Sequence, residues 1–178
     1  QKCQVIRVTN KRRPITSTYK LQGEALQTVS SAKYLGVHID HKLSWNTHVH
    51  HTALKADNTR AFIQRNLRNC PKKVKAQCYT TLVRPILEFA ACAWDPYTMK
   101  NKQRIEKVQR RYARYVYNNY SRESSPTAMQ HELGWETLEE RRAKAKVTMA
   151  YRMQHGLVAI LLNAYLSSVR GHTYKYMI

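Results

Sequence analysis

The sequence is poor in acidic residues and lacks the motifs of a self-contained catalytic site. Against 31 lysines and arginines there are 11 aspartates and glutamates in 178 residues, and the net charge is +20 at pH 7. The three aspartates, Asp40, Asp57 and Asp95, are widely separated and fall on three different predicted elements. Nucleotidyl transfer by two metal ions requires clustered carboxylates, and a glycine-rich phosphate loop is also absent. We therefore expect no catalytic residue on this chain.

Metal-binding patterns are also missing. The four cysteines show no CxxC spacing, so neither a structural zinc site nor a disulfide framework is expected. His48 and His51 lie three residues apart on a predicted helix, which could place both imidazoles on one metal ion. No carboxylate or cysteine lies at matching spacing, and a metal site needs such supporting ligands. We therefore expect no metal ion and no cofactor on this chain.

Long apolar runs and a leader pattern are absent as well. The longest apolar run, residues 157–162, is far too short to cross a bilayer. The first residues lead into an alternating strand and not into the apolar core of a signal peptide. We expect no membrane partner. Because the chain opens on Gln1 and not on methionine, we also expect a fragment of a longer polypeptide.

What the sequence does contain is unevenly distributed positive charge. Residues 51–120 carry 15 basic and 4 acidic side chains, whereas residues 121–178 carry 8 and 5. A single charge run is usually a solvated face, but here the imbalance spans the chain and is interleaved with 12 tyrosines. The middle of the chain is therefore expected to face a polyanion, and nucleic acid is the expected partner.

The first 40 residues have the pattern of short strands. Residues 4–8, 19–21, 25–29 and 32–39 are predicted strands, and we expect them to form a small antiparallel sheet. Gly36, inside the last of them, indicates a close approach of backbone or ligand. Three or four short strands bury little surface, so this sheet is expected to lean on residues that precede Gln1.

From Ser44, a good N-cap residue, the apolar period becomes that of a helix, which Asn69 and Pro71 end. A second helix starts near Pro71, and Pro85 inside it predicts a bend around residues 83–86. Its expected inward face consists of Val74, Cys78, Leu82, Ile86 and Phe89. The fold class is therefore α+β, mainly α, with a small antiparallel β-sheet at the N-terminus followed by a basic helical bundle.

The third predicted helix, residues 101–120, separates a packing face from a row of cations. Its packing face consists of Ile105, Val108, Tyr112, Tyr115, Val116 and Asn119. The adjacent cations are Arg104, Lys107, Arg111 and Arg114, spaced roughly 5 to 6 Å apart along the helix. A solvated exterior is the alternative. Because Glu106 is the only acidic residue between Lys100 and Arg122, we favour phosphate contact.

The last third of the sequence predicts three further helices. Ser125 and Pro126 open a short one that ends at Gly134, and Thr137 with Glu140 forms the capping box of a longer one that ends at Gly156. Residues 157–169 predict a last, more apolar helix, which we expect to pack against the rest of the chain and not to bind a ligand. Trp135 is expected to be a core or interdomain plug and not a base-stacking residue.

Four motifs in order resemble one family. They are residues 33–40 (KYLGVHID), the Leu43-Ser44-Trp45 turn, residues 81–90 (TLVRPILEFA) with the following Trp94-Asp95-Pro96, and residues 132–142 (ELGWETLEERR). Together they resemble the C-terminal part of non-LTR retrotransposon (LINE) reverse transcriptases of the jockey and CR1 type. The resemblance covers nearly the whole chain.

The resemblance implies a division of the chain and a role for each part. Residues 1–43 look like the end of the palm, where Tyr34, Leu35, Gly36 and Val37 match the motif that supports the primer terminus. Residues 44–120 resemble the thumb, and residues 121–178 a C-terminal helical extension. The implied partners are an RNA-DNA hybrid or other duplex and the upstream palm of the same polyprotein, which would hold Mg²⁺ with the catalytic aspartates. The implied location is the nucleus and cytoplasm.

Three hypotheses follow. The chain is a non-catalytic fragment of an RNA-directed DNA polymerase that holds the template-primer duplex through phosphates, which position a protein without reading sequence. Alternatively, it is a free-standing basic helical module that binds RNA or DNA, in which case the sheet folds without upstream residues. The third hypothesis is a retroelement relic with no retained function.

Overall fold

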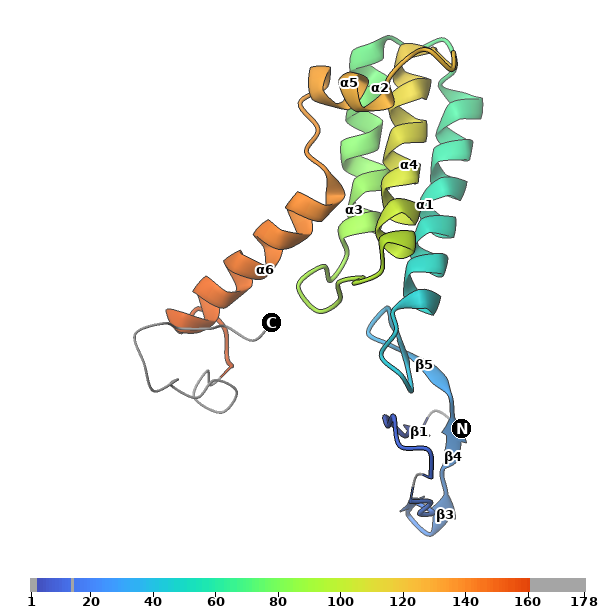
Figure 1. Cartoon of the computed structure of the whole chain (residues 1–178), viewed down its shortest axis with the longest axis vertical. Helices are drawn as coiled ribbons and strands as arrows, with labels where there is room; N and C mark the ends of the chain where they lie inside the picture. The colour runs from blue at the N-terminus through green and yellow to red at the C-terminus, as the bar shows by residue number, and fades with distance from the viewer. Residues whose placement is uncertain (1–2, 14, 161–178) are drawn as a thin grey trace.

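The computed structural model describes residues 3–13 and 15–160, and it consists of a helical bundle with short strands at one end (Figure 1). The strands are β1 (Gln4–Ile6), β2 (Lys20–Leu21), β3 (Glu24–Ala25), β4 (Gln27–Val29), β5 (Ser31–Tyr34) and β6 (Val37–Asp40). The helices are α1 (Asn46–Asn66), α2 (Lys72–Cys78), the π-helix η1 (Tyr79–Val83), α3 (Arg84–Glu88), α4 (Met99–Tyr117), α5 (Pro126–Glu132) and α6 (Leu138–Gln154). The predicted mainly α class with a small β portion is confirmed.

The strands form three separate pairs and not one antiparallel sheet, so that part of the prediction is wrong. β1 pairs with β4 in parallel, whereas β2 with β3 and β5 with β6 are antiparallel. The predicted strand 32–39 turns back on itself at Leu35 and Gly36, which have φ angles of 46° and 88°. Two consecutive residues with positive φ make the tight turn that suits a twisted hairpin.

The strands have no core of their own. Within residues 3–13 and 15–36 no side chain is buried, and Val37 is the first that is. β6 then lies against the start of α1, and Val37 packs into the cluster that fills the helical bundle. The hairpin of β5 and β6 is therefore the part of the strand region that the helices position.

The first helix begins at Asn46 with Trp45 as its N-cap, so the prediction of Ser44 as the cap is wrong. Trp45 has a φ of 56°, and no side chain caps the helix. Ser44 is instead tied to Asp40: its backbone N–H donates to that carboxylate at 3.0 Å, and its hydroxyl donates as well. A charged acceptor makes the stronger hydrogen bond, which keeps the hydroxyl in the preceding turn.

In the bundle, α1 and α4 lie side by side, with the α2–η1–α3 segment packed against both (Figure 1). The predicted inward face of the second helix is wrong by one position. Tyr79, Val83 and Leu87 are fully buried, whereas Val74, Leu82 and Phe89 are between 40% and 55% exposed. The large aromatic decides the rotation: Tyr79 stacks on Trp135 at 4.1 Å between ring centroids, and its hydroxyl donates to the buried Gln109 at 2.5 Å.

Pro85 disturbs the helix, but the disturbance lies before it. Residues 79–83 form the π-helix η1, and Pro85 falls in the first turn of α3. Proline has no N–H and its ring crowds the preceding turn, so widening that turn accommodates it. The prediction therefore placed the irregularity at residues 83–86, about one turn after its position in the structure.

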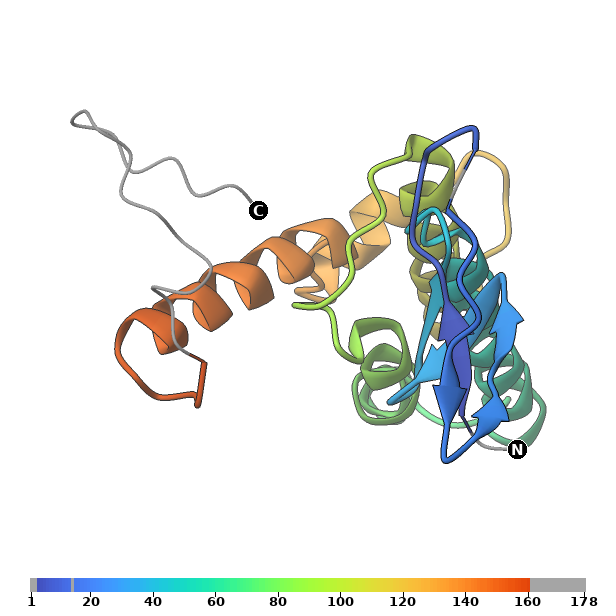
Figure 2. The ribbon, with the colours of Figure 1, turned by 90° about the horizontal axis from the view of Figure 1, so that it is seen from below.

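The C-terminal helices start where predicted. Ser125 caps α5 by accepting the Ala128 N–H at 3.3 Å, and Thr137 with Glu140 forms both bonds of a capping box on α6. Figure 2 shows α6 running away from the bundle, on the side opposite the strands. Trp135 packs on the core cluster, which confirms its role as a plug. Residues 157–160 are not helical, and the rest of the predicted last helix lies outside the described residues.

Candidate nucleic-acid interface

The packing face of α4 is close to the predicted one. Ile105, Val108, Tyr112, Tyr115 and Val116 are at most 3% exposed. Asn119 is exposed, because the helix ends at Tyr117 and Asn118 reverses the chain with a φ of 51°. Burial of one side of α4 fixes the direction of the other side. The predicted cations therefore lie on the outer surface of the bundle.

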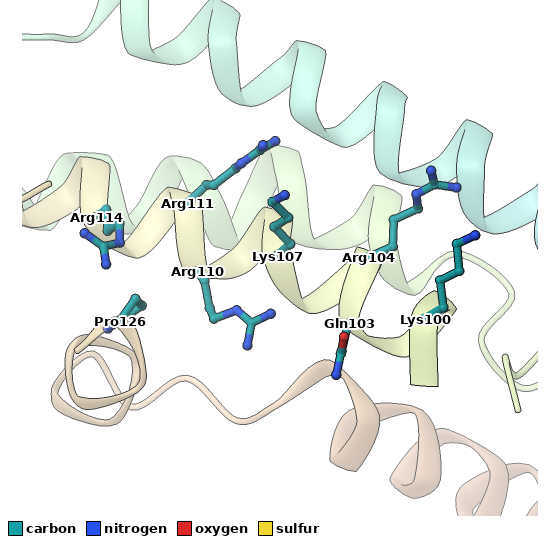
Figure 3. Close-up of a pocket in the computed structure, with 8 residues that line it drawn as sticks. All are labelled: Lys100, Gln103, Arg104, Lys107, Arg110, Arg111, Arg114 and Pro126. Atoms are coloured by element: carbon teal, nitrogen blue, oxygen red, sulfur yellow. The ribbon is translucent and has the colours of Figure 1, made fainter. Parts of the chain in front are cut away.

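The cations of α4 point in two directions (Figure 3). Lys100, Arg104, Lys107 and Arg111 are directed toward α1, whereas Arg110 is directed toward the connection between α5 and α6. All five line one shallow depression together with Gln103, Arg114 and Pro126. The helix therefore presents a row of four cations beside α1, whereas Arg110 and Arg114 lie away from α1.

The four predicted cations do not have the same surroundings. Arg104 and Lys107 are exposed, and neither forms an ion pair within the part of the chain that the structure describes. Arg111 pairs with Asp57 of α1 at 3.1 Å. Arg114 donates to the carbonyls of Ser121 and Ser124, at 2.8 and 3.2 Å, and so holds the loop after α4. Arg104 and Lys107 are thus the two that offer all their charge to a ligand.

α1 contributes the second wall of a groove, which the sequence analysis missed. α1 and α4 run in the same direction: Asn101 donates to Asn46 at 2.7 Å at one end, and Tyr115 donates to the Leu67 carbonyl at 2.8 Å at the other. The α1 residues along this seam are His50, Ala53, Leu54, Asp57, Ala61, Gln64 and Arg65, and Arg68 follows in the turn after the helix. Their spacing of three and four residues is visible in the sequence and indicates one helix face. Only the packing of α1 against α4 shows that this face lines a groove.

We call this surface the α1/α4 groove. Its lower part is lined by His50, Leu54, Arg104, Lys107 and Arg111, and its upper part by Arg65, Arg68 and Tyr120. Gln64 donates to the Tyr120 hydroxyl at 3.0 Å and closes the upper end. The cations of the lower part come from α4, and those of the upper part come from the end of α1 and the turn after it. Such a succession of cations can hold a polyanion such as a nucleic-acid backbone.

The turn formed by Tyr34, Leu35, Gly36 and Val37 lies elsewhere. Tyr34 and Leu35 are 66% and 78% exposed at the tip of the β5–β6 hairpin, whereas Val37 is buried. Gly36 lines a separate depression with Phe89, His38, His51 and Lys55. The structure therefore does not bring the two predicted sets of binding residues into one groove.

Gly36 has a structural explanation within the chain. Its φ is 88°, and a Cβ atom built on it would lie 2.9 Å from Cε1 of Phe89. Both conditions exclude a side chain without rearrangement. The close approach that the sequence indicated is thus made by an aromatic ring of the same chain.

Three histidines meet beside this turn. The rings of His38 and His51 stack at 4.4 Å, and Nδ1 of the buried His48 accepts the His38 N–H at 3.2 Å. Burial, followed by the charges of His38 and His51, lowers the pKa of His48 to about 4. Among residues 3–13 and 15–160, no group of three histidine, cysteine or acidic side chains could hold a metal ion.

The three aspartates belong to three separate networks. Asp40 accepts N–H groups of the turn before α1, Asp57 pairs with Arg60 and Arg111, and Asp95 pairs with Arg142 and Lys146 of α6. For each of them, burial raises the carboxyl pKa but these partners outweigh it, so the net pKa is lowered. The prediction that they lie on different elements is confirmed, and each carboxylate is already used by the fold.

Comparison with known proteins relates the chain to a polymerase. It is 27% identical over 158 residues to a protein of Drosophila melanogaster described as a probable RNA-directed DNA polymerase from transposon BS. The match covers 82% of this chain but 17% of that protein, so the chain corresponds to about a sixth of the polymerase's length. No family model and no solved structure matches. The similarity supports a region related to a retrotransposon reverse transcriptase.

A membrane surface is the other polyanion that a basic chain could meet. Within residues 3–13 and 15–160, no helix has the length and apolar character needed to cross a bilayer.

Proposed function

We propose that this chain is the palm end, thumb and C-terminal extension of a non-LTR retrotransposon reverse transcriptase of the jockey or CR1 type. In this role it holds the template-primer duplex through phosphate contacts and contributes no catalytic aspartate. The likeness to a transposon polymerase supports the enzyme class, and the order of the four sequence motifs supports the subtype.

The observation that carries the binding role is the pair of unneutralised cations in the α1/α4 groove. Arg104 and Lys107 lie one turn apart, are exposed, and form no ion pair within the described residues. A lysine or arginine without a protein partner can replace the counterions of a phosphate, and their release drives binding. A solvated exterior would place acidic residues among such cations, and here Asp57 alone does so.

The hairpin turn supplies a second contact in this proposal. Tyr34 and Leu35 project from a turn that Val37 and Phe89 anchor to the bundle, so the backbone of the turn is held while its tip stays accessible. We assign this tip to the primer terminus on the basis of the family motif. Mg²⁺ then belongs to the upstream palm, with which the strands would pack, and the expected location is the nucleus and cytoplasm.

A salt titration with a short RNA-DNA hybrid tests the binding role. If about six phosphates are contacted, affinity falls by about 10³ between 50 and 200 mM salt. The double variant Arg104→Gln/Lys107→Gln should reduce the slope of log K against log salt by roughly two, because each contact contributes about 0.9. Arg114→Gln should change the slope less, since its guanidinium holds carbonyls of residues 121 and 124.

The control is Lys144→Gln/Arg152→Gln, which removes the same charge from α6, outside the groove. It should leave the slope near that of the wild type. A flat salt response of the wild-type chain would overturn the proposed function. Equal changes in the two double variants would show that net charge, and not the groove, binds the hybrid.

A further inference from the structure

The α1/α4 groove contains one acidic side chain among the residues described as lining it, and that residue lies at its centre. Asp57 lies between the lower cations, Arg104 and Lys107, and the upper cations, Arg65 and Arg68. It is 27% exposed and binds Arg60 at 2.7 Å and Arg111 at 3.1 Å. One carboxylate therefore holds Arg111, which lines the groove, and Arg60, which lies beside it and also donates to Gln64 at 2.7 Å.

The same stripe of α1 carries the groove past Asp57. Residues 50, 54, 57, 61 and 65 fall within about 80° of one another at 100° per residue, so they form one face, and Arg68 follows just after the helix ends. His50 to Arg65 spans about 22 Å of helix, which is the axial length of six or seven base pairs. The groove is long enough for one stretch of duplex to reach both groups of cations.

We propose that Arg65 and Arg68 form the upper end of the duplex-binding track, and that Asp57 is an electrostatic latch that withholds Arg60 and Arg111 from the phosphates. This inference rests on the proposed function and adds to it the length of the track and a residue that limits its affinity. Arg60 and Arg111 each bond the carboxylate, so a phosphate must compete with an anion that is already in place.

A purely structural role of Asp57 predicts a different result. Its bond to Arg111 links α1 to α4, so its loss would weaken the fold without strengthening binding. If Asp57 instead withholds the arginines from phosphates, its loss should strengthen binding. Asp57→Asn keeps the shape of the side chain but removes the charge. Release of Arg111 should add one contact, and Arg60 adds a second if its guanidinium also leaves Gln64.

The measurement is the affinity for a hybrid of about 18 base pairs at 50 and 200 mM salt. Two added contacts would enlarge the ratio of the two affinities by about tenfold in Asp57→Asn, given 0.9 per contact. The matched control is Glu24→Gln, which removes one negative charge from the exposed strand β3, away from the groove. If Asp57→Asn changes the ratio no more than Glu24→Gln does, the latch is wrong.

Two further variants test the proposal even if Asp57→Asn folds poorly. Arg60→Gln/Arg111→Gln should reduce the wild-type slope by less than one, because both side chains are held by Asp57. Arg65→Gln/Arg68→Gln should reduce it by about two. A reversed order of these effects would overturn the inference. Wild-type binding that is strong and salt-dependent in the same experiment keeps the proposed function intact, whereas absent binding removes both.

Discussion

The buried His48 makes the stability of the bundle depend on pH. Its ring is 3% exposed and lies against Trp94 at 4.5 Å between centroids, while Nδ1 accepts the His38 N–H. Protonation would remove that acceptor and place a charge among buried groups. The charges of His38 and His51 also oppose it.

The size of the effect follows from the two pKa values. His48 titrates at about 4 in the folded chain, against an ordinary value of 6.5. Above pH 6.5 the ring is neutral in both states and contributes nothing. Below that value the unfolded chain binds a proton that the folded chain refuses. At pH 5 the difference costs about 2 kcal/mol, at about 1.4 kcal/mol per pKa unit.

Urea denaturation at about pH 7.5 and about pH 5 measures this difference. The wild-type free energy of unfolding should fall by about 2 kcal/mol over this range. His48→Asn keeps an acceptor near the Nδ1 position and should abolish most of the fall, although it lowers the stability at both pH values. Asp40, Asp57 and Asp95 do not interfere, because their lowered pKa values move their losses below the ordinary carboxyl range.

The control is His50→Asn, at an exposed position of the same helix. It should leave the pH dependence unchanged. The reasoning is refuted if the wild-type chain is equally stable at both pH values, or if His48→Asn retains the full difference.

Three further substitutions test the packing that positions the candidate site. Gly36→Ala should lower the free energy of unfolding by about 1 to 2 kcal/mol because of its positive φ, and further because of the contact with Phe89. Gly134→Ala, with a φ of 65° and nothing within 4 Å, should show the loss from the positive φ alone. Equal losses for the two variants in urea denaturation would exclude the Phe89 contact. Tyr79→Phe leaves the buried Gln109 oxygen without its donor and should cost about 1 to 3 kcal/mol in the same assay. Thr137→Ala should cost about 1 kcal/mol by loss of the capping box, and Thr148→Ala, in the exposed middle of α6, should stay within about 0.5 kcal/mol.

Local rules predicted the starts of α5 and α6 better than the buried face of the second predicted helix. The caps at Ser125 and Thr137 form because each side chain reaches an N–H of its own first turn. The face of the second helix came out wrong because its rotation depends on a distant partner. Tyr79 must meet Trp135 and Gln109, and no periodicity within the helix contains that information.

The strand region failed for a related reason. The alternation from Ala32 to Ile39 fits a single strand, but in the hairpin Tyr34 pairs with Val37, so the turn at residues 35 and 36 places two positions three apart on one face. A strand pattern does not contain this change of phase. The parallel pairing of β1 with β4 depends on contacts between segments more than 20 residues apart, which strand patterns do not specify. Gly36 was correctly expected at a close approach, but the approaching group could be identified only in three dimensions.

The candidate site shows the same division between local and distant information. The cations of α4 were found from one helix, since a stripe of basic residues beside an apolar face is visible in the sequence alone. The second wall, with Arg65 and Arg68, required the alignment of α1 with α4. The two arginines that differ most from expectation, Arg111 and Arg114, are those that find partners in other segments.

The few acidic residues are unevenly distributed over the surface of the bundle. Glu88 and Asp95 pair with Arg141, Arg142 and Lys146 and so join α6 to the bundle, while Lys102 pairs with Glu139. Glu106 accepts the Glu139 N–H at 3.0 Å on the same side. The acidic residues that bind cations or helix N–H groups thus concentrate where α6 meets the bundle, and the α1/α4 groove on the other side of α4 keeps its excess of cations.

Asp57 is the exception to this distribution, and it makes the groove testable. A chain with a charge of +20 needs no further anion for solubility, and α1 and α4 already share the buried Val49, Ile63, Val108 and Tyr115. The packing of these side chains already holds the two helices together, so an acidic residue at the centre of the basic groove adds little to their association. Its main physical consequence is to lower the positive potential at the centre of the groove.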